Sequence, residues 1–155
     1  MSRLLPLVLL LSPGAAGQGS MSKETTITLR RTCLGTCPEY KLTIRGDGSV
    51  VYEGKHYVHA TGFRKGKISS SAVHALVQKF QDANFFEMSG GGIVIDAPVR
   101  TVSVDMNGRH KELKEGCACP PELVRLEDEV GKTAGSERWV RGRVRVFLHW
   151  PGMRS

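Results

Sequence analysis

The segment EYKLTIRGDGSVVYEG, residues 39–54, constrains the fold more than any other part of this chain. Polar and apolar residues alternate in its two arms, 40–44 and 50–52, and such alternation is typical of strands with one buried and one solvated face. The GDGS sequence between the arms predicts a tight turn, so we expect a β-hairpin. Its buried face would carry Tyr40, Leu42 and Ile44, and its solvated face Lys41, Thr43 and Arg45.

Strand patterns also precede and follow this hairpin. Residues 25–31 alternate in the same way, and residues 56–68 show a weaker strand pattern in which two glycines allow bends. Two further segments, 99–106 and 109–115, flank Asn107-Gly108, a dipeptide that favours the tight turns of hairpins. The chain is therefore expected to form about five to six strands.

Two segments have helical periodicity instead. Ser69 or Ser70 can cap a first helix, whose apolar stripe fades near Asn84 and consists of Val73, Leu76, Val77 and Phe80. Pro120-Pro121 is expected to open a second helix. In that helix Leu123, Leu126 and Val130 should point inward, and Glu127, Asp128 and Glu129 mainly outward.

The order of these elements predicts the fold class. Single strands do not alternate with long helices, so a parallel, doubly wound sheet is not expected. The pattern favours an α+β fold, with a mostly antiparallel sheet of about five to six strands and two helices packed on one face.

The ends of the chain differ in character from its middle. Arg3, the apolar run 4–11 and the small residues at 15–17 resemble a secretory signal peptide. We therefore expect a signal peptide at 1–17, a linker at 18–25, one domain at 26–140 and a basic tail at 141–155. This arrangement predicts a periplasmic or secreted protein, or a cytoplasmic one if Met21 is the true start.

The net charge of +7 belongs mostly to these ends. Five arginines fall between 138 and 155, where there is no acidic residue, whereas residues 18–137 are almost neutral. A basic fold for specific nucleic-acid binding is therefore not expected. The tail instead suggests contact with an anionic surface, a loosely attached tail, or an additional charged edge strand.

The opening motif of the domain resembles a known family. TCLGTCPEYKLTIRGDGSVVYEG contains Cys33, Gly35, Cys37, Pro38 and Tyr40 in a C-x-G-x-C-P-x-Y arrangement, followed by the GDG hairpin and a closing AGSERWV. Residues 26–140 are similar to a family of small, mostly exported bacterial domains, domain of unknown function 6438. The resemblance implies an α+β fold and an extracytoplasmic setting, and it brings no known activity. The GCACPP segment and the arginine-rich tail have no counterpart in it.

The four cysteines allow three interpretations. Cys33 and Cys37 are separated by three residues, and Cys117 and Cys119 by one. In an exported protein an even number of cysteines favours structural disulfides, with Cys33–Cys37 the favoured single bond. Alternatively, thiol–disulfide exchange would use Cys119 as the nucleophile, because it precedes a helix. A zinc site built from all four cysteines is the third interpretation.

Other side chains carry weaker signals. Tyr40, Lys41 and Arg45 of the hairpin and Asp96 in the irregular loop 89–98 are candidate binding residues. Asp47 is expected to stabilise its own turn. The chain contains neither a G-x-S-x-G nor an H-E-x-x-H motif, and nothing calls for a cofactor.

These observations favour a small, exported, non-catalytic binding module of the bacterial envelope, whose partner would be an envelope protein or an anionic surface. A thiol-active or zinc-binding protein is the alternative.

Overall fold

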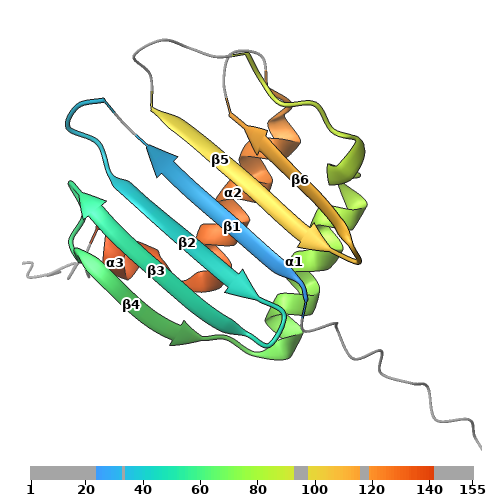
Figure 1. The fold of residues 1–155 in the computed structure, drawn as a ribbon, viewed down its shortest axis with the longest axis horizontal. Coiled ribbons are helices and arrows are strands. Elements are labelled where there is room, and N and C mark those ends of the chain that lie inside the picture. Colours follow the sequence, from blue (N-terminus) through green and yellow to red (C-terminus); the bar gives the residue numbers. More distant parts are fainter. Residues whose placement is uncertain (1–23, 33, 93–97, 116–118, 142–155) are drawn as a thin grey trace, which may run out of the picture.

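The computed structural model describes residues 24–32, 34–92, 98–115 and 119–141. Its elements form one antiparallel sheet in the order β4-β3-β2-β1-β5-β6, with helices along one face (Figure 1). In chain order they are β1 (Thr26–Thr32), β2 (Glu39–Arg45), β3 (Ser49–His56), β4 (Gly62–Lys67), α1 (Ser70–Asp82), η1 (Phe85–Glu87), β5 (Val99–Met106), β6 (Arg109–Lys114), α2 (Pro121–Ala134) and α3 (Glu137–Val140). The expected α+β fold with an antiparallel sheet is confirmed.

The two predicted hairpin turns form for local reasons. In the β2–β3 turn the Asp47 carboxylate accepts a hydrogen bond from the Ser49 backbone N–H at 2.9 Å. Hydrogen bonding with the side chain and then the backbone of Ser49 lowers the pKa of Asp47. In the β5–β6 turn Asn107 and Gly108 both have positive φ, at 53° and 73°. Paired positive φ values match the right-handed twist of the flanking strands.

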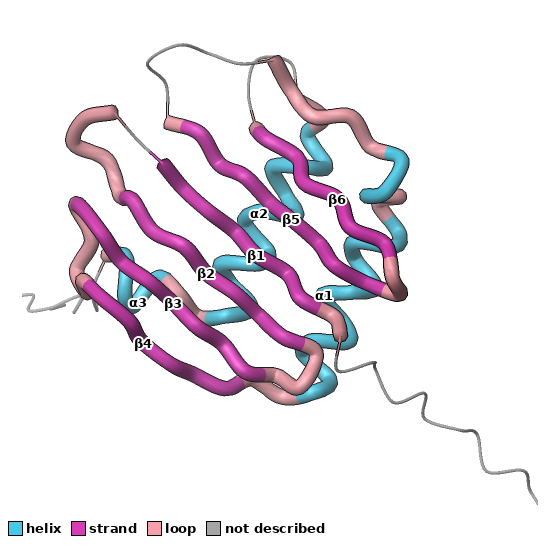
Figure 2. Tube along the Cα trace, viewed as in Figure 1, coloured by secondary structure: helices cyan, strands magenta, loops and turns pink. Residues whose placement is uncertain are grey.

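The core lies between the sheet and the helices α1 and α2, which cover a single face (Figure 2). Ser69 caps α1 by accepting the Ala72 backbone N–H at 3.1 Å. The buried side chains alternate along the strands and recur at helical spacing in α1 and α2. The largest are Ile27, Leu42, Ile44, Tyr52, Leu76, Phe80, Phe85 and Leu123. The opposite face of the sheet is polar, as the alternation in 39–54 predicted.

Two local expectations need correction. The weak strand expected over 56–68 is shorter, because β3 ends at His56 and β4 begins only at Gly62. Glu127, expected to point outward from the second helix, is fully buried. It lies four residues after Leu123 and three before Val130, so it falls within the apolar stripe of α2.

The short helix α3 packs against the sheet at β3 and β4. Trp139 packs on Tyr52 with 5.2 Å between ring centroids, and Arg138 stacks over the Trp139 ring. The backbone N–H groups of His59 and Ala60 donate to the carbonyls of Val140 and Trp139. Within the part of the chain that the structure describes, no helix has the length and apolar character needed to cross a membrane.

Candidate functional site

Two arginines stand directly opposite each other at inward-facing positions on neighbouring strands. Arg31 of β1 pairs with Arg100 of β5 on one side and with Tyr40 of β2 on the other. All three lie at the end of the sheet covered by α2, where the alternation that buries Leu29 continues to Arg31. The ladder therefore places two cations and a phenol in one row beneath a helix.

Arg100 is surrounded by carboxylates. It binds Glu115 through two nitrogens, with Nε–Oε2 at 2.5 Å and Nη2–Oε1 at 3.1 Å, and Asp128 through Nη1 at 2.6 Å. The bond from Arg100 lowers the pKa of the Glu115 carboxyl. The same hydrogen bonds raise the pKa of Arg100, so the pair of Arg100 and Glu115 is ionised at neutral pH.

Glu127 lies next to Arg100 but receives no hydrogen bond from it. Its Oε2 is 3.1 Å from Arg100 Nε. That nitrogen carries a single hydrogen, which it donates to Glu115. Neither oxygen of Glu127 accepts a hydrogen bond from a described residue, although its side chain has no exposed area. When protonated, the Glu127 carboxyl donates a hydrogen bond to Glu115. Burial first, and then the nearby carboxylates Glu115 and Asp128 against the opposing pull of Arg100, raises the pKa of Glu127 to about 8.

Arg31 contrasts with Arg100. It is half-buried, its Nε is fully buried, and that nitrogen has no hydrogen-bond partner within the described ranges. No ion pair joins Arg31 to any residue that the structure describes. One of the two opposed arginines is therefore saturated by acids, and the other keeps its hydrogen-bonding capacity.

Arg31, Arg100 and Glu127 line one cleft of about 420 Å³ between the sheet end, α2 and α3. We call it the Arg31 cleft. Its apolar lining comes from Leu29, Pro38, Tyr40 and Val140. Its remaining polar lining consists of Asp128, Lys132, Ser136, Glu137 and Arg141, with Gly131 and Gly135 between them. This volume falls in the range of small-molecule sites in proteins.

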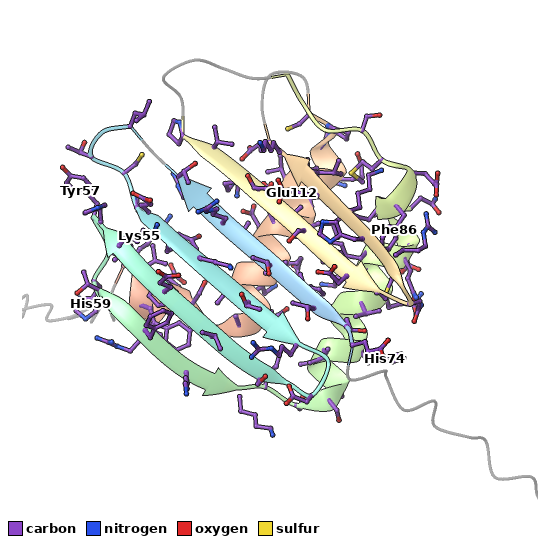
Figure 3. The ribbon with its side chains drawn as sticks, viewed as in Figure 1. Lys55, Tyr57, His59, His74, Phe86 and Glu112 are labelled. Carbon is purple, nitrogen blue, oxygen red and sulfur yellow. The ribbon has the colours of Figure 1, made fainter. Side chains whose placement is uncertain are left out.

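A second and larger depression, of about 540 Å³, lies on the polar face of the sheet. Its charged lining includes Arg30, Lys41, Glu112 and Lys114, all of them exposed, and Figure 3 labels Glu112 on β6. Exposed side chains of this kind are satisfied by water and form a solvated face. The Arg31 cleft is the stronger candidate, because its polar groups are withdrawn from water without being fully paired.

The candidate binding residues do not form one site. Tyr40 and Lys41 are neighbours on β2 and point to opposite faces, so Tyr40 lines the Arg31 cleft and Lys41 the polar face. Arg45 lies at the other end of β2, opposite Thr26. Asp96 lies outside the described residues. Burial raises the pKa of the Tyr40 hydroxyl, which keeps that group neutral.

The cysteines divide into two kinds. Cys37 is disulfide-bonded, and Cys33 and Cys117 lie outside the described residues, so the pairing stays a prediction. Cys119 is a half-buried free thiol, so the expectation that all four cysteines are bridged does not hold for it. It directly precedes Pro120, the N-cap residue of α2.

Among the residues that the structure places, histidines and acids do not gather into a metal site. His59 of the β3–β4 loop and His74 of α1 lie at opposite ends of the molecule (Figure 3). His110 binds Asp105 at 2.6 Å on the surface. Among the described residues no group of three or more His, Cys, Asp or Glu side chains could hold a metal ion. Two of the four cysteines of the zinc interpretation fall outside that set.

Sequence reasoning missed Arg31, Arg100 and Glu127, although each left a signal. Each is a charged residue at a position that its element's periodicity assigns to the core. Such conflicts between pattern and residue type are expected where a fold carries function or a buried ionic network.

A family model described as Domain of unknown function (DUF6438) matches residues 25–134. No curated protein matches the chain.

Proposed function

The chain belongs to the DUF6438 family, and from this premise and the geometry of the Arg31 cleft we propose that it is a small, non-catalytic binding module of the bacterial envelope. The Arg31 cleft is its ligand site. One observation carries the proposal: Arg31 brings to the cleft a buried nitrogen that no described residue satisfies. Unsatisfied buried groups cost stability, so they are rare in proteins unless they serve a purpose.

Binding rather than catalysis is favoured by the state of the cleft's other groups. Arg100 is held by Glu115 and Asp128, and the Ser136 hydroxyl donates to the Gly131 carbonyl at 3.1 Å. A hydroxyl committed as a donor to a carbonyl has no base beside it to activate it as a nucleophile. The groups left for a ligand are therefore the Arg31 guanidinium and the rim of the cleft.

Export is part of the proposal. It is supported by the apolar run 4–11 after Arg3 and by the disulfide at Cys37, because disulfides persist mainly in oxidising compartments. The same reasoning favours Cys33 as the partner of Cys37. Intact-mass analysis of protein from a bacterial envelope should find a chain that starts after residue 17. A chain that starts at Met1 or Met21, with every cysteine open to alkylation, would contradict export.

The ligand site can be located by NMR. We expect fragments screened against the full ¹⁵N-labelled chain to shift backbone amides around the cleft, such as those of Gly131, Gly135 and Ser136. The Thr28, Thr101 and Ser103 amides of the polar face serve as internal controls. Binding confined to those three residues, or no binding at all, would overturn the assignment of the Arg31 cleft.

A further inference from the structure

We propose that the Arg31 cleft recognises a free carboxylate attached to a short apolar group, and that Arg31 is the residue that binds it. The inference rests on the proposed binding function and specifies its ligand class. It begins from the difference between the two opposed arginines. Arg100 donates to two carboxylates, whereas Arg31, on the neighbouring strand, has none among the described residues.

The unpaired state of Arg31 is unusual for its surroundings. An arginine in a half-buried position is normally paired, because a charge withdrawn from water loses hydration. Glu115 and Asp128 already bind Arg100, so they are not available to Arg31. The planar guanidinium presents donors in a fork that matches the two oxygens of a carboxylate.

The charge of the cleft also fits a single negative charge. Its cationic lining consists of Arg31, Arg100, Lys132 and Arg141. Its acids are Asp128, Glu137 and Glu127, of which burial keeps Glu127 protonated near neutral pH, and Glu115 binds Arg100 from outside the lining. Four cations against the three other carboxylates leave a net charge of +1. A small excess of positive charge suits a monoanion. Phosphate carries up to two negative charges near neutral pH, and it would also be repelled by the carboxylate of Asp128.

The rest of the lining indicates what the carboxylate is attached to. Apolar surface is offered by Leu29, Pro38, Tyr40 and Val140. The volume of about 420 Å³ admits ligands that range in size from a few heavy atoms to a dipeptide. A small free acid and the C-terminus of a peptide both present this chemistry. The experiment therefore includes a probe for each.

The probes for the full chain are N-acetyl-alanyl-leucine with a free carboxylate, its C-terminal amide, propionate, and inorganic phosphate. Affinity is measured by titration calorimetry and by ¹⁵N shifts. We expect the acid to bind in the cleft about tenfold or more tightly than the amide, because a hydrogen-bonded charge pair contributes at least that factor. Propionate that binds as tightly as the acid dipeptide would support the proposal and make a small acid the ligand.

Matched variants separate Arg31 from general electrostatics. Arg31→Gln should weaken binding of the acid by about tenfold or more, and Arg31→Lys by less, since lysine keeps the charge but loses the fork. Arg30→Gln removes the same charge from the adjacent residue on the opposite face, and should leave the affinity unchanged. Equal loss in the Arg30 and Arg31 variants would overturn the role of Arg31.

A pH series tests the cleft without disturbing Arg31. Glu127 is faced by Arg100, whose pKa is raised, by Glu115, whose pKa is lowered, and by Asp128. Affinity for the acid should fall as the pH rises through about 8, when Glu127 ionises, and should stay constant in Glu127→Gln. An amide that binds as tightly as the acid, or phosphate that binds more tightly, would overturn the carboxylate assignment and leave the binding function standing. If no probe shifts the cleft amides, both the carboxylate assignment and the proposed binding function are wrong.

Discussion

Arg100 is the residue on which the charged end of the sheet depends. Its guanidinium bridges the C-terminal end of β6, through Glu115, to α2, through Asp128. The carboxylates bound to Arg100 limit the electrostatic cost of its position opposite Arg31, because like charges facing each other on a sheet are unfavourable.

Replacement of Arg100 by alanine should lower the free energy of unfolding by about 3 kcal/mol, because it leaves several carboxyl groups without a counterion. The hydrogen bond from Arg100 lowers the pKa of Glu115 in the folded chain. The Glu115 carboxylate therefore stabilises the fold at pH values above the ordinary glutamate pKa, and this stabilisation is lost as the pH falls through the lowered pKa. The difference between variant and wild type should therefore narrow in acid. Arg109→Ala, which removes an exposed pair with Glu87, should cost less than about 1 kcal/mol in urea unfolding.

Glu127 has the opposite linkage. Its pKa in the folded chain is about 8, above the value of 4.5 expected when unfolded, so the folded state holds more protons between these values. Stability attributable to Glu127 is therefore lost as the pH rises from about 5 to 8. Glu127→Gln should raise the free energy of unfolding by about 1–3 kcal/mol at pH 8 and have little effect at pH 4. A gain that is independent of pH would show that Glu127 is not protonated in the folded chain.

At the scale of elements, the two hairpins are defined by glycines in different surroundings. Gly48 and Gly108 both have positive φ, at 83° and 73°. A Cβ at Gly48 would lie 2.4 Å from the backbone oxygen of Ile68, whereas a Cβ at Gly108 would meet nothing within 4 Å. The first turn is therefore held both by its own hydrogen bond from Ser49 to Asp47 and by a tertiary contact with Ile68, whereas the second depends on its own sequence.

This difference predicts unequal costs for the same substitution. Gly108→Ala should destabilise the protein by about 1–2 kcal/mol, the cost of a left-handed conformation for an L-residue. Gly48→Ala should pay that cost and also displace the Ile68 backbone, which loses its hydrogen bond to the Gly48 carbonyl. Thermal unfolding of the two variants side by side measures the excess. Equal losses would mean that the contact between Gly48 and Ile68 adjusts freely.

At the scale of the whole molecule, the sheet presents two unlike surfaces. One face is solvated and polar, and the other carries the core and, at the end beneath α2, the Arg31 cleft. The β1–β2 connection, where Cys37 lies, borders this end of the sheet. A disulfide in that connection would hold the strand ends that position Arg31 and Tyr40.

The proposed Cys33–Cys37 bond can be tested on the whole chain. Cys33→Ser should lower the free energy of unfolding by about 2 kcal/mol in oxidised protein, at the low end of the disulfide range because the closed loop is short. The variant and the wild type should become equally stable in reductant. Cys119→Ser serves as the control, since that thiol is free. If Cys33→Ser left the stability unchanged, Cys37 would have a different partner.

Much of the fold was predictable because its signals are local. The alternation in residues 39–54, the Asn107-Gly108 turn and the stripe that begins at Val73 each depend on neighbouring residues alone. The boundaries of β4 were harder to predict from the sequence. This strand is an exposed edge with little apolar pattern, and its inner side is covered by Trp139, far along the chain.

Most of the candidate site was not predicted from the sequence, and Tyr40 is the residue of the Arg31 cleft that was named beforehand as a candidate binding residue. Arg31, Arg100 and Glu127 come from three elements, and each looks like a surface residue when read alone. Their significance depends on which charges become neighbours, and that depends on strand order and on the packing of α2 across the sheet.

By itself the sequence determined the class of this protein: an antiparallel sheet with one apolar face, two amphipathic helices to cover it, and a solvated face opposite. Periodicity settles these features because burial of apolar surface needs no knowledge of distant partners. Only the tertiary structure decided that β1 lies between β2 and β5, so that one arginine meets the acids of the β6 end and α2 while its neighbour stays unpaired. The energy of a charge depends on its distances to other charges and to water, and the fold alone sets those distances.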